Sequence, residues 1–201
     1  MANNAVDHLS TATATGSYTS TINFDLSSIT VTDYRFFKVV GTVRSNWNNT
    51  PSRGNGHDFI IQKFNDDATT SNYAFGGLFV DGNATGKSFT YYNTADGKGQ
   101  YIGRCPSVGK TNNNQTAAWG LFESYIQANN TDWDTVGYVH CTATGGNQSD
   151  GFNSGSYDNN ISRGSFWWHN TAVLTKITYD LVNSYFTAGT KISLYGFKNT
   201  A

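Results

Sequence analysis

The chain has 201 residues, of which 37% are hydrophobic, 15% aromatic and only 13% charged, and its formal net charge is −1. A chain of this length can bury a substantial core without disulfides. No cluster of Lys and Arg occurs, which argues against binding to nucleic-acid phosphates. No apolar segment is long enough to span a bilayer, so we expect no membrane insertion.

The N-terminal residues 1–20 differ in pattern from residues 21–201. The first segment is polar, contains the repetitive stretch Thr11–Thr15 and has no periodic apolar residues, so it is predicted to be a flexible arm. Such an arm is either disordered or becomes ordered when it docks on a neighbouring molecule. Residues 21–201 are predicted to form a single soluble domain.

Apolar and polar residues alternate in a series of short segments separated by Gly, Asn and Asp. This period of two is typical of half-buried β-strands. The predicted strands are 21–27, 34–44, 59–64, 73–80, 89–92, 100–102, 119–127, 137–143, 166–169, 173–180 and 191–197. Segment 119–127 also fits one helical turn, although its centre, Glu123–Ile126, favours a strand. The pattern predicts an all-β fold: a two-sheet antiparallel β-sandwich, jelly-roll-like, with a flexible N-terminal arm.

Two connections between predicted strands, 106–116 and 145–164, are long, polar and nearly free of aliphatic residues. Loops of this length in a compact domain are usually functional or mobile. The second connection is the longer of the two, and it is predicted to form a protruding tip.

The two cysteines, Cys105 and Cys141, lie far apart in the sequence. The polar N-terminal segment lacks the apolar centre of a secretory signal peptide, which predicts synthesis in a cytosol, where thiols stay reduced. We therefore expect two free, partly buried thiols. A disulfide between them is the alternative.

No pattern in the chain indicates a catalytic site, so the protein is predicted not to be an enzyme. A nucleophilic serine needs an oriented base, and the G-x-S-x-G turn that presents such a serine does not occur. His140 and Cys141 are adjacent on a predicted strand, so they point to opposite faces. A catalytic pair of Asp residues stays open, because the sequence does not show which carboxylates converge in space.

No cofactor is predicted, and calcium is the one cofactor hypothesis that stays open. The histidines are scattered and no Cys-x-x-Cys motif occurs, which argues against a transition-metal site. Two turns, Asn65–Asp67 and Asp81–Asn83, offer oxygen ligands of the kind that Ca²⁺ takes. The commoner role of Asp and Asn in such turns is to hydrogen-bond their own backbone.

Aromatic residues are more numerous than one core readily hides. On a strand, Trp167 and Trp168 must face opposite sides, so one of them can be buried and the other exposed. Exposed rings on a sheet face or a loop tip suit sugars and protein interfaces. The alternative is that the sheets or a neighbouring subunit bury both rings. The candidate contact residues for a partner or a glycan are Trp167, Trp168, His169, Tyr157, Asn153 and Trp133.

Two segments near the C-terminus form a recognisable pattern. Gly164–Ile177 reads GSFWWHNTAVLTKI, and Phe186–Lys198 reads FTAGTKISLYGFK. Together they resemble the C-terminal signature of a widespread group of bacteriophage and virus-like structural proteins. Upstream, Glu123–Asn130 is similar to the strand that precedes this signature in the group. The sequence departs from the pattern at Phe197, where an aliphatic residue is more usual.

The resemblance implies a virion component made in the host cytoplasm, of the tail-fibre, tail-spike or minor structural kind. Such proteins are typically β-sandwiches and often oligomeric, and a homotrimer is favoured. The implied partners are other virion structural subunits and host surface polysaccharide, with no nucleic acid. Because the signature marks folding rather than chemistry, it implies no catalytic residue.

Three functions follow from these observations. The leading hypothesis is a tail- or fibre-associated module that recognises the host surface, with many copies giving avidity. The second is a capsid decoration or cement protein, whose N-terminal arm and aromatic strands bind neighbouring subunits. The third is a glycan-cleaving virion enzyme on a sandwich scaffold.

Overall fold

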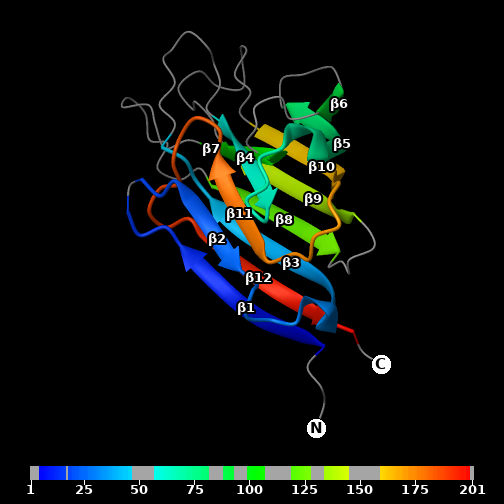
Figure 1. The fold of residues 1–201 in the computed structure, drawn as a ribbon. Helices are drawn as coiled ribbons and strands as arrows, with labels where there is room; N and C mark the ends of the chain where they lie inside the picture. The colour runs from blue at the N-terminus through cyan, green and yellow to red at the C-terminus, as the bar shows by residue number, and fades with distance from the viewer. Residues whose placement is uncertain are drawn as a thin grey trace, which may run out of the picture.

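The computed structural model describes residues 5–16, 18–46, 57–81, 88–92, 99–106, 119–127, 134–144 and 159–199. Within these ranges the chain folds into two antiparallel β-sheets, with short 3₁₀ turns at Val31–Asp33 and Thr70–Asn72 (Figure 1). The predicted two-sheet β-sandwich is therefore confirmed. In the same ranges, no helix has the length and apolarity that crossing a membrane requires.

The described strands form one sheet of eight strands and one of four. In spatial order, the larger sheet contains β1 (Val6–Thr13), β12 (Lys191–Lys198), β3 (Tyr34–Val43), β8 (Gly120–Gln127), β9 (Thr135–Thr144), β10 (Asn159–Trp168), β5 (Tyr73–Asp81) and β6 (Ser88–Tyr92). The smaller sheet contains β2 (Thr21–Asp25), β11 (Lys176–Leu181), β4 (His57–Phe64) and β7 (Gln100–Pro106).

Most of the strands follow jelly-roll order. Along the chain, β1, β2, β3, β4, β7, β8, β11 and β12 alternate between the larger and the smaller sheet, except that β4 and β7 both lie in the smaller sheet. The resulting spatial orders, β1-β12-β3-β8 and β2-β11-β4-β7, are those of a jelly roll built from two Greek keys. Strands β9, β10, β5 and β6 extend the larger sheet beyond β8, as Figure 1 shows. The larger sheet is therefore wider than the smaller sheet that covers it.

The structure corrects the prediction of a flexible N-terminal arm over residues 1–20. Val6–Thr13 form the edge strand β1, which pairs antiparallel with Lys191–Phe197 of β12. The hydroxyl oxygens of Thr11 and Ser193 lie 2.8 Å apart across this pair. The prediction was wrong because backbone hydrogen bonds hold β1 in the sheet, and a search for periodic apolar residues does not detect them.

The core between the sheets follows the alternation of side chains along the strands. On β3, Phe37 and Val39 are fully buried, whereas Phe36 lies on the opposite face of the sheet. Ile192 and Leu194 of β12 are buried in the same way. Burying a side chain of this size contributes about 1.5–3 kcal/mol to the free energy of folding.

The protruding tip predicted at 145–164 is wrong over its last six residues, because residues 159–164 belong to β10. Residues 145–158 lie outside the described residues, as does most of the other predicted loop. The strand escaped detection because its inward positions are the small residues Ser162 and Gly164, rather than large apolar ones. A Cβ atom at Gly164 would lie 2.3 Å from the Phe75 ring, so the core leaves no room there.

Gly137 of β9 is a second position where the packing requires glycine. A Cβ atom there would lie 2.1 Å from the carbonyl oxygen of Tyr125 and 2.4 Å from Cζ of Phe166. Neither group is the free end of a flexible side chain. The missing side chain therefore allows β9 to lie between the β8 backbone and the Phe166 ring.

We expect Gly137→Ala to lower the free energy of unfolding by about 2–3 kcal/mol, because the added methyl group overpacks the core. The matched control is Gly76→Ala on β5, since a Cβ atom at Gly76 meets nothing within 4 Å. The control should change the free energy of unfolding by no more than about 1 kcal/mol. Urea denaturation followed by circular dichroism measures both values, and equal losses would contradict this packing.

Candidate functional site

The two adjacent tryptophans of β10 have opposite environments. Trp168 is fully buried, and its indole Nε1 donates a hydrogen bond to Oδ2 of Asp67 at 2.7 Å. Trp167 is 44% exposed on the outer face of the larger sheet. The predicted opposition of the two rings is confirmed. The prediction of Trp168 as a contact residue was wrong, because its ring is buried in the core and its indole N–H is hydrogen-bonded to Asp67.

Asp67 connects the turn after β4 to Trp168. Its carboxylate accepts hydrogen bonds from Nδ2 of Asn72 at 2.8 Å and from the backbone N–H of Thr69 at 2.8 Å, in addition to the indole. Burial by itself would raise the pKa of Asp67. The hydrogen bonds from Asn72, Trp168 and Thr69 outweigh burial and lower the pKa to about 2.

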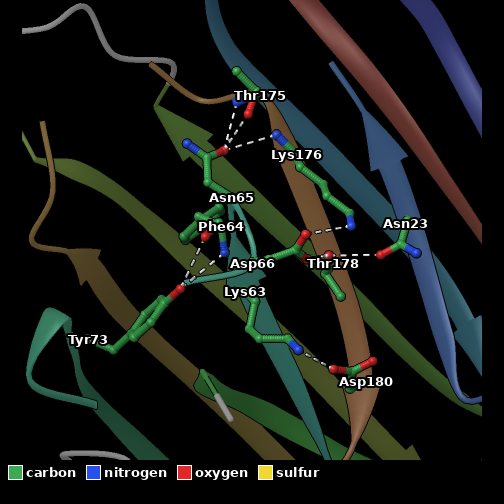
Figure 2. Close-up of polar contacts among 10 residues, drawn as sticks. All are labelled: Asn23, Lys63, Phe64, Asn65, Asp66, Tyr73, Thr175, Lys176, Thr178 and Asp180. Atoms are coloured by element: carbon green, nitrogen blue, oxygen red, sulfur yellow. Dashed lines mark hydrogen bonds and ion pairs between the residues drawn. The ribbon is translucent and has the colours of Figure 1, made fainter. Parts of the chain in front are cut away.

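Charged groups on the outer face of the smaller sheet pair with one another where β2, β11 and β4 meet. Nζ of Lys63 lies 2.8 Å from Oδ2 of Asp180, and Nζ of Lys176 lies 2.7 Å from Oδ2 of Asp66 (Figure 2). The Thr178 hydroxyl donates to Oδ1 of the neighbouring asparagine of β2 at 2.8 Å. These contacts join β2, β11 and β4 and leave this face without a concentration of unpaired charge.

The oxygen atoms of the predicted calcium turn Asn65–Asp67 are used by protein partners. Oδ1 of Asn65 accepts hydrogen bonds from the backbone N–H groups of Thr175 and Lys176, as Figure 2 shows. Lys176 also pairs with Asp66, and the Asp67 carboxylate binds the indole of β10. The three side chains therefore stabilise the turn. Of the second turn, Asp81–Asn83, Gly82 and Asn83 lie outside the described residues.

The outer face of the larger sheet is aromatic and is the best candidate for a functional surface. Five neighbouring strands place a ring in one row on this face: Phe197 of β12, Phe36 of β3, Tyr125 of β8, Tyr138 of β9 and Trp167 of β10. We call this row the aromatic strip. Each of these positions has a buried neighbour in its own strand, namely Gly196, Phe37, Ile126, Val139 and Trp168, so the strip lies on the outer face.

The rings of the strip lie close enough to contact one another. The centroids of Phe36 and Phe197 are 4.3 Å apart, those of Phe36 and Tyr125 are 6.2 Å apart, and those of Tyr125 and Tyr138 are 6.5 Å apart. Tyr138 and Trp167 lie on paired strands, with Tyr138 opposite Ser165, two residues before the tryptophan. Ring contacts thus link Phe197 to Tyr138 across four strands, and Trp167 extends the row on the next strand, diagonal to Tyr138.

One charged pair lies beside the centre of the strip. Nζ of Lys38 lies 5.0 Å from the centroid of the Tyr125 ring and 3.3 Å from Oε1 of Glu123. The Tyr125 hydroxyl donates to Oε2 of Glu123 at 3.1 Å. Contact with Tyr125 raises the pKa of Lys38, burial opposes this, and Glu123 raises it further. The lysine is thus held in its charged form and fixes the position of the Tyr125 ring.

The other predicted contact residues are not part of the strip. His169 is exposed, and its Nδ1 lies 2.8 Å from Oδ2 of Asp134. Tyr157, Asn153 and Trp133 lie outside the described residues. Of the six candidates, Trp167 alone is placed by the structure on the aromatic face.

The two cysteines are free thiols, as expected from the sequence. Cys105 and Cys141 are both buried and are not bonded to each other. Burial raises the pKa of both thiols, to about 12 for Cys141. Within the described ranges, no group of three or more His, Cys, Asp or Glu residues could hold a metal ion.

Four members of the strip were missed by sequence reasoning: Phe36, Phe197, Tyr125 and Tyr138. Their outward direction follows from the alternation along each strand. The order of the strands was the missing information, because it alone shows that the rings are neighbours.

Comparison of the chain with protein-family models, with curated proteins and with solved structures finds no match in any of the three.

We expect Asp67→Asn to lower the free energy of unfolding at pH 7 by about 1–2 kcal/mol, since the substitution removes charge-assisted hydrogen bonds from a partly exposed carboxylate. The folded-state pKa is depressed, so the Asp67 contribution is present above pH 4 and is lost as the pH falls towards 2.

The difference between wild type and Asp67→Asn should therefore shrink between pH 4 and pH 2. Urea titrations across this interval measure it. A difference that stays constant down to pH 2 would show that the Asp67 charge does not stabilise the fold.

Proposed function

We propose that this protein is a structural component of a virus particle, a tail- or fibre-associated module that presents the outer face of its larger sheet to a binding partner. The observation that carries the proposal is the aromatic strip, a row of partly exposed rings on an otherwise well-packed jelly roll. Exposed apolar patches of this kind mark interaction sites. The fold alone does not indicate a function, although jelly rolls are common in viral and lectin domains.

The location of the C-terminal segments supports this reading. The segments that resemble phage structural proteins contribute to β10, β11 and β12, and the last two are inner strands of the smaller and the larger sheet. Ile177, Ile192 and Leu194 are buried there. The turn before β12 uses Gly189 with a φ of 89°, a conformation that favours glycine. The shared pattern thus falls on residues that the fold requires.

The pairing of β1 favours a tail-associated module over a capsid decoration protein anchored by a free arm. Residues 6–13 already have their hydrogen-bonding partners in β12 on one side. To act as a free arm that extends to another subunit, these residues would have to leave the edge of the larger sheet. The proposal assigns no catalytic residue.

Gold-labelled antibodies against the purified full chain test this proposal on particles of the virus that encodes it. We expect the label on intact particles, at the tail or its fibres. Label confined to the capsid shell would favour the decoration protein instead. Absence of the chain from purified particles, by both labelling and mass spectrometry, would contradict the proposal.

A further inference from the structure

We propose that the aromatic strip binds a linear acidic polysaccharide, with the sugar chain lying across the strands from β12 to β10. This inference rests on the proposed function, because it names the kind of host surface that the module would recognise. Three features support it: the row of rings, the positively charged Arg163 near the exposed end of the strip, and the rigid placement of the rings at the centre of the strip.

The strip has the shape of a site for an extended polymer. Neighbouring strands lie about 4.8 Å apart, so the five strands that supply the rings span about 19 Å. The centroid separations of 6.2 Å and 6.5 Å at Tyr125 show that the rings follow this spacing closely. An extended chain of pyranose rings has a repeat of similar size, so several successive sugars can each meet one ring.

The exposed end of the strip is formed by Tyr138 and Trp167, which are 40% and 44% exposed. Both rings combine an apolar surface with a polar edge, which suits the apolar face and the hydroxyl groups of a sugar. Ser165 is exposed between them, opposite Tyr138, and its hydroxyl is available to a ligand on this face. These residues provide the stacking and hydrogen-bonding groups that a glycan site uses.

Charge on this part of the face favours an acidic ligand. Arg163 is exposed on the same side of β10 as Trp167, four residues away. Its cross-strand neighbours are His140 on β9 and Leu78 on β5, and neither carries negative charge. Beyond His140, Glu123 is already paired with a lysine. The guanidinium of Arg163 is therefore free of a neighbouring carboxylate in its row, and its planar fork suits the carboxylate of a uronic acid.

The centre of the strip is held rigid before any ligand binds. Lys38 lies against the Tyr125 ring, and Glu123 accepts a hydrogen bond from the Tyr125 hydroxyl. The ring is therefore fixed from two sides. Phe36 and Phe197 are stacked with an interplanar angle of 15°. Rings that are already ordered lose little conformational freedom on binding, which favours affinity.

Affinity electrophoresis of the full chain through gels that contain polygalacturonate, a linear polyuronate, tests the proposal. Gels that contain pullulan, an uncharged polysaccharide, are the reference. We expect polygalacturonate to retard the wild-type protein and Trp167→Ala to weaken this retardation at least tenfold. The matched control is Tyr185→Ala, because Tyr185 is 45% exposed but lies outside the strip. The control should bind like the wild type.

Arg163→Gln tests the charge preference separately from stacking. This variant should lose most of its preference for polygalacturonate over pullulan, and the salt dependence of binding should weaken, while its circular dichroism spectrum stays unchanged. Retention of the full preference by Arg163→Gln would overturn the assignment of an acidic ligand.

Two results would overturn the polysaccharide proposal as a whole. The first is that neither polymer retards the wild-type protein. The second is a concentration-dependent oligomer, seen by analytical ultracentrifugation, that Trp167→Ala dissolves, since the strip would then be an interface between copies of this chain. Both results leave particle labelling unaffected, so failure of this inference is distinguishable from failure of the proposed virion role.

Discussion

The buried ring of Trp168, with its indole hydrogen bond to the carboxylate of Asp67, is a central constraint on which face of β10 turns outward. A slip of one residue would bring Trp167 into the core and expose Trp168, because side chains alternate between the faces of a strand. The hydrogen bond and the space around the buried ring fit one register only. The exposed end of the aromatic strip therefore depends on a contact made on the opposite side of the sheet.

Small inward residues allow the widened sheet to form around this anchor. Gly137 and Gly164 lie where the Phe166 and Phe75 rings fill the core, and any side chain there would collide with them. The outward positions of the same strands can then carry large residues without competing for core volume. β9 and β10 thus combine inward glycines with large outward residues such as Tyr138 and Trp167, although Phe166 and Trp168 of β10 also face the core.

The all-β class and most of the strands could be predicted, because alternation in segments such as 34–44 and 191–197 is strong. Strand β1 could not be predicted, because backbone pairing rather than apolar alternation holds it in the sheet. The first half of β10 could not be predicted either, because its inward residues are small. Of the five residues of the aromatic strip, Trp167 was the one that the sequence identified as a candidate contact residue. Its four companions in the strip are separated by up to 161 residues along the chain, from Phe36 to Phe197, and only strand order brings them together.

The most direct test of the outer face as the binding surface is an NMR titration of the isotopically labelled full chain with a polygalacturonate oligosaccharide. The expected result is a shift of the Trp167 indole signal and of the Tyr138 and Tyr125 ring signals, while the Trp168 indole signal stays in place. Shifts confined to the outer face of the smaller sheet, around Lys63 and Lys176, would contradict the assignment of the binding surface to the aromatic strip.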